Sequence, residues 1–439
     1  MKHNILVVGL ALSLAARTSL AQPSPGPEAP APTPTPPAPP APAPAPTPPA
    51  PTPPAPTPAP TPPVSSEFED EPVTLTPTPA PKPGSKPAPA DGHDHRPTTL
   101  DELTVPAQRQ RLEINLFGAM QLRFSSEEHY DDFALGPLGF VASGRMSPTL
   151  TALSEFVMET TDTGEAVVDL ERVVLRWTHD RFAVSAGRTH TDFGYWNNAY
   201  HHGTWLQPTA DRPLTLRFED DGGLLPVHWI GVWGEYRHPV GKGHLRTLLA
   251  IGNGRGANVD DLRVASDVNA AKSINLNVSL DNVLSPGTRV GGSVLLDRIA
   301  AQPVDVRPAL PDERITELIG SLFVSHRGDT WTLIGEGYYV AHDAPSDFAA
   351  ALFGFGLLAY SYERYTPYVL VEARKSFGGV DPFFVPDPAA GVSVPNFGSL
   401  NAGVRFELST WSSLKLEGSV ARSEGETVAE GIVDWAFGL

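Results

Sequence analysis

The residues of this 439-residue chain whose types and spacing could do chemistry gather between positions 190 and 205. Histidines, a carboxylate, amides and large aromatic rings follow one another closely: His190, Asp192, Tyr195, Trp196, Asn197, Asn198, Tyr200, His201, His202 and Trp205, with Arg212 and Arg217 shortly after. Aromatic faces mixed with hydrogen-bonding groups suit small polar solutes such as sugars or aromatic acids. We treat these twelve residues as the candidate site.

Part of this set has the donor atoms of a metal site. His190, Asp192, His201 and His202 offer the imidazole and carboxylate ligands that Zn²⁺ takes from proteins. Adjacent histidines rarely bind one ion, and the sequence does not show that the four side chains converge. We therefore expect no metal and no cofactor. The chain also has no cysteine, which excludes thiolate metal sites and cysteine nucleophiles.

The candidate residues lie in a connector, 190–226, that is far longer than an ordinary loop. Its aromatic content argues against disorder. Two structures remain open for it: a wall that contacts a passing solute, or a cap that packs on itself.

The segments that flank this connector alternate apolar and polar residues with the period of a β-strand. Sixteen strands are predicted, at approximately 111–124, 133–143, 149–160, 166–178, 181–189, 227–238, 243–252, 273–281, 287–297, 314–326, 329–341, 348–361, 364–376, 397–408, 413–421 and 430–439. The second and the twelfth have the weakest alternation. The fold class is therefore all-β.

The connections between these strands alternate in length. Every second one is a short turn, such as His179-Asp180, whereas those between include 190–226, 253–272 and 377–396. Short turns at one end and long loops at the other are typical of a transmembrane antiparallel up-and-down β-barrel. Closure satisfies every backbone hydrogen-bonding group inside a lipid bilayer. A secreted soluble β-protein would also alternate, but it does not explain the asymmetric turns.

If the apolar faces meet lipid, the polar faces line the lumen. The charged residues assigned to it are Glu113, Arg123, Glu155, Glu159, Arg172, Arg176, Glu317, Glu336, Glu372, Arg374, Arg405, Glu407, Lys415, Glu417 and Asp434. Six are basic and nine acidic, which predicts a wet lumen with at most a mild preference for cations. The alternative is a salt-bridge network that holds a narrow barrel shut.

The N-terminal quarter has a different composition. Residues 1–21 have the charged, apolar and small-residue parts of a signal peptide. In 22–97 the chain carries 31 of its 48 prolines, so we predict a disordered periplasmic linker that forms neither helix nor sheet. Residues 98–110 lead into a barrel spanning 111–439. No later window is apolar and long enough for a membrane helix.

The C-terminal 330 residues or so resemble the sixteen-stranded outer-membrane porins, most closely the phosphate-selective type. The residues that carry the resemblance are 169–172 (Asp-Leu-Glu-Arg), 185–188 (Ser-Ala-Gly-Arg), 366–369 (Thr-Pro-Tyr-Val) and 399–406 (Ser-Leu-Asn-Ala-Gly-Val-Arg-Phe). The resemblance implies that the long third loop folds into the lumen and sets the constriction, and that solutes cross passively, usually through a trimer.

Two departures from the family pattern limit what is carried over. Phe437 is followed by Gly438-Leu439, whereas such porins generally end in an aromatic residue. The third loop also lacks the many Lys and Arg of phosphate-selective members, so phosphate selectivity is not implied.

The resemblance thus implies a passive channel, no enzyme activity, and as partners outer-membrane lipid, the barrel-assembly machinery and a homotrimer. The formal charge of −18 without any basic stripe excludes nucleic acid. Two other functions stay open: a tether to the cell wall through the linker, and an outer-membrane enzyme, although no serine with a nearby histidine and carboxylate is apparent.

Overall fold

The structure, a computed structural model, describes residues 112–126, 132–160, 166–201, 203–217, 223–256, 271–302, 312–381, 383–384 and 394–439. The predicted signal peptide, linker and lead-in lie outside these residues, as does His202. Among the residues described, no helix has the length and apolar character needed to cross a membrane.

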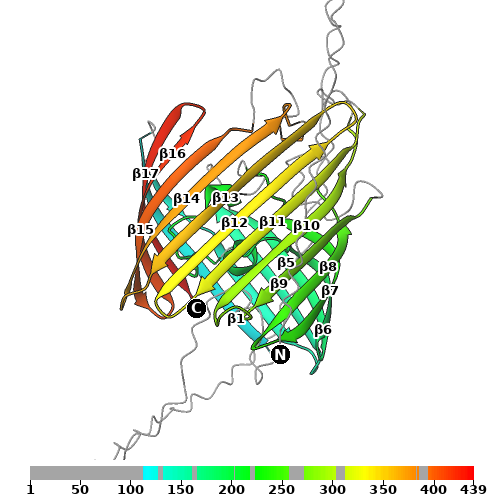
Figure 1. Cartoon of the computed structure of the whole chain (residues 1–439). Helices are drawn as coiled ribbons and strands as arrows, with labels where there is room; N and C mark the ends of the chain where they lie inside the picture. Colours follow the sequence, from blue (N-terminus) through cyan, green and yellow to red (C-terminus); the bar gives the residue numbers. More distant parts are fainter. Residues whose placement is uncertain are drawn as a thin grey trace, which may run out of the picture. The chain divides into compact units, whose positions relative to one another are not determined.

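Most of the described chain is β-strand (Figure 1). The strands are β1 (Leu112–Ser125), β2 (Asp132–Leu135), β3 (Leu138–Arg145), β4 (Leu150–Thr160), β5 (Ala166–His179), β6 (Phe182–His190), β7 (His228–Val240), β8 (Gly243–Asn253), β9 (Ser273–Asp281), β10 (Thr288–Ile299), β11 (Ile315–Arg327), β12 (Trp331–Asp343), β13 (Phe348–Tyr360), β14 (Tyr365–Gly378), β15 (Phe397–Ser409), β16 (Ser412–Ser423) and β17 (Glu426–Gly438).

From β3 onward each strand pairs antiparallel with the next, β1 pairs with β2 and β3, and β1 also pairs with β17, so the sheet closes on itself. β2 and β3 both pair with β1, at Met120–Arg123 and at Leu112–Phe117, and together they occupy one position in the barrel. They are separated at Gly136-Pro137, where proline has no N–H to give to the ladder. The barrel therefore has sixteen strand positions, as predicted.

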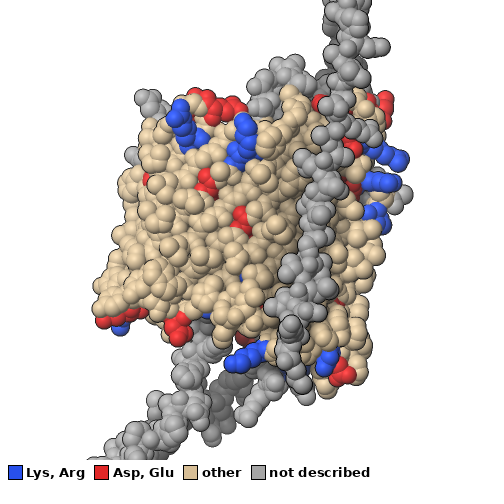
Figure 2. All heavy atoms as spheres, in the orientation of Figure 1, with Lys and Arg blue, Asp and Glu red and all other residues tan. Residues whose placement is uncertain are grey.

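The predicted alternation decides which residues face outward. On β1, Leu112, Ile114, Met120 and Phe124 are exposed, and the residues between them are more buried. The same pattern around the barrel leaves an outer surface that is mostly uncharged between two charged rims (Figure 2). An apolar belt on a closed barrel is how β-proteins meet the bilayer interior.

The two ends of the barrel differ as predicted. The end that holds Leu439, at the bottom of Figure 1, has tight turns such as Asp180-Arg181, where Asp180 adopts φ 51°. Exposed aromatic residues lie beside these turns: Trp177, Trp331, Tyr360, Tyr362, Tyr365 and Trp411. At the opposite end the connectors are longer, with the exceptions of 344–347 and 424–425. The last strand also begins at Glu426, four residues earlier than predicted, because β16 and β17 join in a two-residue turn.

Candidate functional site

The connector from β6 to β7 lies inside the barrel. Its described residues form a short helix, α2 (Trp196–Tyr200), and a 3₁₀ turn, η1 (Leu214–Leu216). Most of its described residues are buried, and their partners include side chains on the inner faces of β1, β8, β9, β12 and β14–β16. The loop therefore packs on the inner wall as well as on itself.

Three inward-facing glutamates accept hydrogen bonds from the loop backbone. The N–H of Trp196 lies 2.6 Å from Glu336 Oε1, that of Thr215 lies 2.9 Å from Glu372 Oε2, and that of Ala210 lies 3.1 Å from Glu417 Oε2. Buried backbone donors without a strand partner need acceptors, and these carboxylates on β12, β14 and β16 provide them. All three were assigned to the lumen from the sequence.

The basic side chains of the same wall bind the loop's carbonyl groups. Arg405 Nη1 donates to Gln207 O at 2.7 Å, and Lys415 Nζ donates to Thr204 O at 2.6 Å. Lys415 also forms an ion pair with Asp434 at 3.0 Å, in which both side chains are fully buried. On this side of the inner wall, acidic side chains thus accept hydrogen bonds from loop N–H groups, and basic side chains donate to loop carbonyls. The wall and the loop are therefore complementary.

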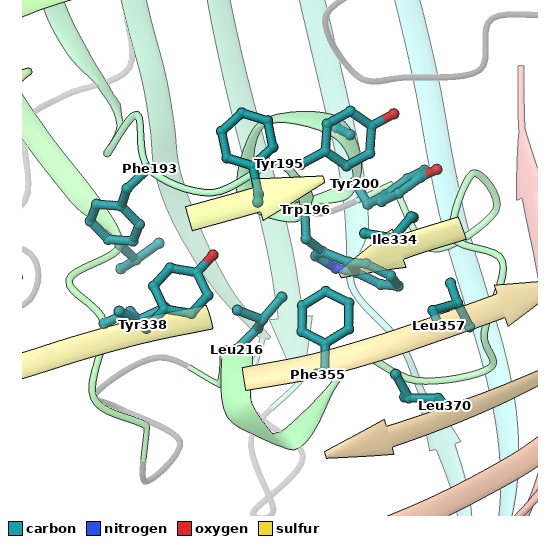
Figure 3. Close-up of a cluster of buried hydrophobic side chains, with 14 of the residues drawn as sticks. Phe193, Tyr195, Trp196, Tyr200, Leu216, Ile334, Tyr338, Phe355, Leu357 and Leu370 are labelled. Atoms are coloured by element: carbon teal, nitrogen blue, oxygen red, sulfur yellow. The ribbon is translucent and has the colours of Figure 1, made fainter. Parts of the chain in front are cut away.

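The loop's aromatic rings fill the space between α2 and the wall (Figure 3). The rings of Trp196 and Phe355 meet edge to face with centroids 5.7 Å apart, and those of Phe193 and Tyr338 at 6.2 Å. Tyr195, Trp196, Tyr200 and Trp205, which were expected to offer stacking faces to a solute, are each less than 7% exposed. In this structure their contacts are with protein.

The remaining candidate residues also hold the loop in place. Asn197 Nδ2 donates to Thr191 O at 2.7 Å, and Asn198 Nδ2 donates to Asp192 Oδ1 at 2.9 Å. Arg212 Nη2 donates to the carbonyl of His201 at 2.8 Å. Arg217 is half-buried.

An ion pair outside the candidate set fixes the middle of the loop. Arg123 Nη2 lies 2.9 Å from Asp211 Oδ2, and about a third of each side chain is exposed. Burial alone would raise the pKa of Asp211, but the Arg123 guanidinium outweighs it and lowers that pKa below its ordinary value. Burial also raises the pKa of Tyr200 on α2, which therefore stays neutral.

The loop leaves a cavity of about 480 Å³ on the other side of the lumen, along β3 to β10. Its lining includes Arg145, Arg172, Arg176, Arg237, Arg246 and Arg289, but only two carboxylates, Asp192 and Glu235. Arg246 bridges these two at 2.7 and 3.0 Å, and Arg176 lies 3.4 Å from Glu235. Two neighbouring acids also offset the arginines: Glu155 pairs with Arg172, and Asp281 lies 2.9 Å from Arg289. The open space is therefore arginine-rich.

The charged residues that the sequence assigned to the inner wall differ in burial. Ten of the predicted charged residues are buried: Glu155, Arg172, Glu317, Glu336, Glu372, Arg374, Arg405, Lys415, Glu417 and Asp434. Glu113, Arg123, Arg176 and Glu407 are partly exposed, and Glu159 is exposed near the end of β4. Four cavity arginines were missed: Arg145, Arg237, Arg246 and Arg289. Alternation could have identified Arg246, because the apolar Leu249 and Ile251 lie on the opposite, exposed face of β8.

Of the four residues considered for a metal, His202 lies outside the described residues. Asp192 pairs with Arg246, whereas the rings of His190 and His201 lie 3.6 Å apart between centroids. His190 instead meets Glu171 and His228, neither of which was considered as a metal ligand from the sequence.

A buried Asp–His pair is the arrangement closest to hydrolase machinery that we find in the described chain. His342 Nδ1 lies 2.8 Å from both carboxylate oxygens of Asp381, which connects β14 to β15. Its Nε2 lies 3.0 Å from Glu317, itself bound by Arg255 at 2.6 Å. The position where a nucleophilic hydroxyl would stand is thus taken by a carboxylate. The His342 imidazole lowers the pKa of Asp381, against the opposing effect of burial.

Comparison with known proteins agrees with this architecture. No protein-family model matches the sequence, and neither does any of the curated proteins compared with it. Among solved structures, the outer membrane channel DcaP of Acinetobacter baumannii is similar, with a TM-score of 0.52 and 8% identity over 75% of this chain and 97% of that one.

Two further solved structures have comparable scores. OmpF of Salmonella typhi, in complex with daunomycin, has a TM-score of 0.50 and 11% identity over 75% of this chain and 97% of that one. An anion-selective porin from Comamonas acidovorans has a TM-score of 0.49 and 11% identity over 75% of this chain and all of that one, 100%. At these identities the likeness concerns the fold. The chain has the closed sixteen-stranded antiparallel barrel fold that outer-membrane porins have.

Proposed function

We propose that this protein is an outer-membrane channel through which small polar solutes diffuse passively, beside a third loop that narrows the lumen. The observation that carries the proposal is the division of the lumen. Loop 190–226 occupies the side of β12 and β14–β16, and a cavity of about 480 Å³ remains along β3 to β10. A packed loop beside an open polar space is what a constricted channel requires.

We infer further that the open path prefers anions. The sequence led to the opposite expectation because it counted all inward acids equally. Glu336, Glu372 and Glu417 are bound to backbone N–H groups of the loop and lie away from the cavity. Six arginines and two carboxylates line the cavity itself. Fixed charges along the path determine which ions enter it, so the local excess of arginine outweighs the acidic balance of the whole chain.

The outer-membrane location and the partners expected from the sequence are part of the same proposal. The signal peptide and the apolar belt favour the outer membrane, with lipid and the barrel-assembly machinery as partners. A homotrimer, and the similarity to phosphate-selective members, stay predictions. We propose no catalytic activity, because the buried Asp381–His342 pair faces Glu317 and no hydroxyl nucleophile.

Reconstitution in a planar bilayer tests the proposal. Folded protein should give discrete conductance steps, and under a KCl gradient its reversal potential should have the sign of an anion-preferring pore. Arg145→Glu with Arg176→Glu should move that potential toward cation preference. The matched control is Arg364→Glu with Arg422→Glu. Arg364 lies at the tight-turn end, Arg422 lies on β16, and neither lines the cavity, so this variant should leave the reversal potential unchanged. Folded protein without conductance above background would reject the channel.

A further inference from the structure

Three side chains with metal-binding atoms converge where loop 190–226 leaves and re-enters the barrel wall. His190 is the last residue of β6 and His228 the first of β7, and the two are paired directly across the strands. Glu171 comes from the neighbouring strand β5. One ligand atom of each lies within 4.8 Å of the others. Glu171 Oε2 is 3.5 Å from His190 Nε2 and 2.5 Å from His228 Nε2.

A β-bulge aims Glu171 at this point. Between β4 and β5, Glu155 pairs with Arg172 and Phe156 pairs with Leu170, which leaves Glu171 without an opposite residue. The bulge buries two consecutive residues, Glu171 and Arg172, between exposed neighbours. Bulges re-aim side chains and are common beside functional sites. Without it, strand alternation would direct only one of the two into the barrel.

The ring of another histidine, His201 in the loop, packs against this group. The His201 ring lies 3.6 Å from that of His190 between centroids. Asn197 Nδ2 donates to Thr191 O, so its Oδ1 faces His201 Nδ1 at 2.9 Å and accepts a hydrogen from it. The neutral His201 ring therefore has its lone pair on Nε2. Fixing a tautomer through the other ring nitrogen is how proteins orient histidines around metals.

The chemistry of the three residues matches one class of ligand. Two imidazoles and a carboxylate form a common protein ligand set for Zn²⁺, with the fourth position left to water or a solute. Ligand atoms about 2.1 Å from a tetrahedral ion lie about 3.4 Å from each other. The distance from Glu171 to His190 already fits, whereas that from Glu171 to His228 must widen by about 1 Å.

We propose that Glu171, His190 and His228 bind one divalent transition-metal ion of the Zn²⁺ class. His201, held by Asn197, supports the His190 ring from the loop side. The ligands bracket the loop, since His190 precedes it and His228 follows it. A bound ion would therefore join both ends of the loop to β5. His190 also lines the arginine-rich cavity, so the open ligand position is within reach of an anionic solute.

This inference goes beyond the proposed function, and its binding test does not depend on conductance. The full chain, purified in detergent, carries His93→Gln and His95→Gln in every sample, because these two histidines in the N-terminal segment offer a competing site. The probes are Zn²⁺, counted per chain after gel filtration, and Co²⁺, whose visible absorption reports four-coordinate nitrogen and oxygen ligands. We expect one ion per chain and the absorption bands of such a site.

The variants separate a metal site from packing. His190→Gln with His228→Gln should abolish stoichiometric binding, and Glu171→Gln should weaken it at least tenfold while keeping the shape of the side chain. His201→Gln should weaken it by about ten- to a hundredfold, as outer-shell partners do. His179→Gln with His238→Gln, both on exposed positions near the tight turns, is the matched control and should bind as the parent does.

Thermal unfolding gives a second measurement on the same proteins. Zn²⁺ should raise the Tm of the parent and of the control, and raise that of Glu171→Gln by less. If the variant with His190→Gln and His228→Gln does not fold, the comparison of Glu171→Gln with the parent decides whether the metal site exists. Equal Zn²⁺ affinity in the parent and in folded Glu171→Gln, or no ion bound by the parent, would overturn the proposal.

Discussion

The indole of Trp205 occupies the space that a side chain at position 438 would need. A Cβ built on Gly438 would lie 2.4 Å from Cε2 of Trp205, a distance that forces one of the two to move. Gly438 N–H in turn donates to Trp411 O at 2.8 Å, and the Trp205 and Trp411 rings lie 5.5 Å apart. The loop thus extends through the lumen to the tight-turn end. Gly438, which Trp205 covers, is one of the two residues that follow Phe437 where such porins generally end in an aromatic residue.

Gly438→Ala should therefore destabilise the barrel by about 1–3 kcal/mol, as overpacking does in a filled core. Trp205→Ala should cost about 3–5 kcal/mol through the cavity it leaves. In the Trp205→Ala background, Gly438→Ala should cost almost nothing, because the clash is gone. Urea unfolding in detergent micelles measures all four corners of the cycle. Gly234→Ala is the control, because an added Cβ there meets nothing within 4 Å. Additive effects would contradict the packing described.

The three loop-binding glutamates give a prediction about current. Glutamine keeps the acceptor oxygen but removes the charge, which lowers the strength of each hydrogen bond by about 1 kcal/mol. Glu336→Gln, Glu372→Gln and Glu417→Gln together should release the loop in part. Planar-bilayer recordings should then show a higher mean conductance and more frequent switching between levels.

A pair of carboxylates outside the loop contacts provides the control for that variant. Glu426→Gln with Glu430→Gln removes two exposed carboxylates from β17, and should leave the current unchanged. A triple variant that conducts as steadily as the parent would mean that these carboxylates do not hold the loop.

The pKa of Asp211 sets a pH dependence of the loop. Its pKa in the folded state is lowered, so the Arg123–Asp211 pair contributes stability above the unfolded value of about 3.9 and loses it as the pH falls through the lower folded value. The effect should be small, under about 1 kcal/mol, because a third of each side chain is exposed to screening solvent.

Limited proteolysis of the loop at pH 7, 4 and 2.5 measures this dependence. Cleavage should rise toward pH 2.5 in the parent. Asp211→Asn should show higher cleavage already at pH 7 and a smaller rise, since it has no charge left to lose. An identical pH profile in both proteins would show that another group is responsible.

Removing residues 23–97 separates the channel from the tether. The barrel described here is complete from Leu112 to Gly438 and closes by pairing β1 with β17. We therefore expect the shortened protein to keep the parent's unit conductance and its Tm. Loss of conductance in folded, shortened protein would indicate that the proline-rich segment takes part in the pore.

Strand positions could be predicted from the sequence because lipid imposes a strict alternation on them. Exposed Leu112, Ile114, Met120 and Phe124 on β1 show it directly. The interruption at Gly136-Pro137 was less predictable, because β2 and β3 are short and their alternation is weak. The predicted start of β17 was wrong, because small and charged residues there obscure the alternation of apolar and polar side chains.

The site was less predictable than the fold. Sequence identified the loop residues, but not that Trp196 and Tyr200 would be buried against Phe355 and the inner wall. Which inward charges meet the loop depends on contacts between residues more than a hundred positions apart. Glu171 was missed because a bulge breaks the alternation that the prediction relies on, and a bulge has no sequence signature here beyond two adjacent charged residues.

The contacts of the third loop also constrain the order of biogenesis. The groups that hold Trp196, Ala210 and Thr215 belong to β12, β14 and β16, which follow the loop in the chain and are synthesised after it. Until those late strands are in place, these three N–H groups lack their carboxylate acceptors and need others, such as water. We therefore expect the late strands to pack around a loop that is synthesised before them.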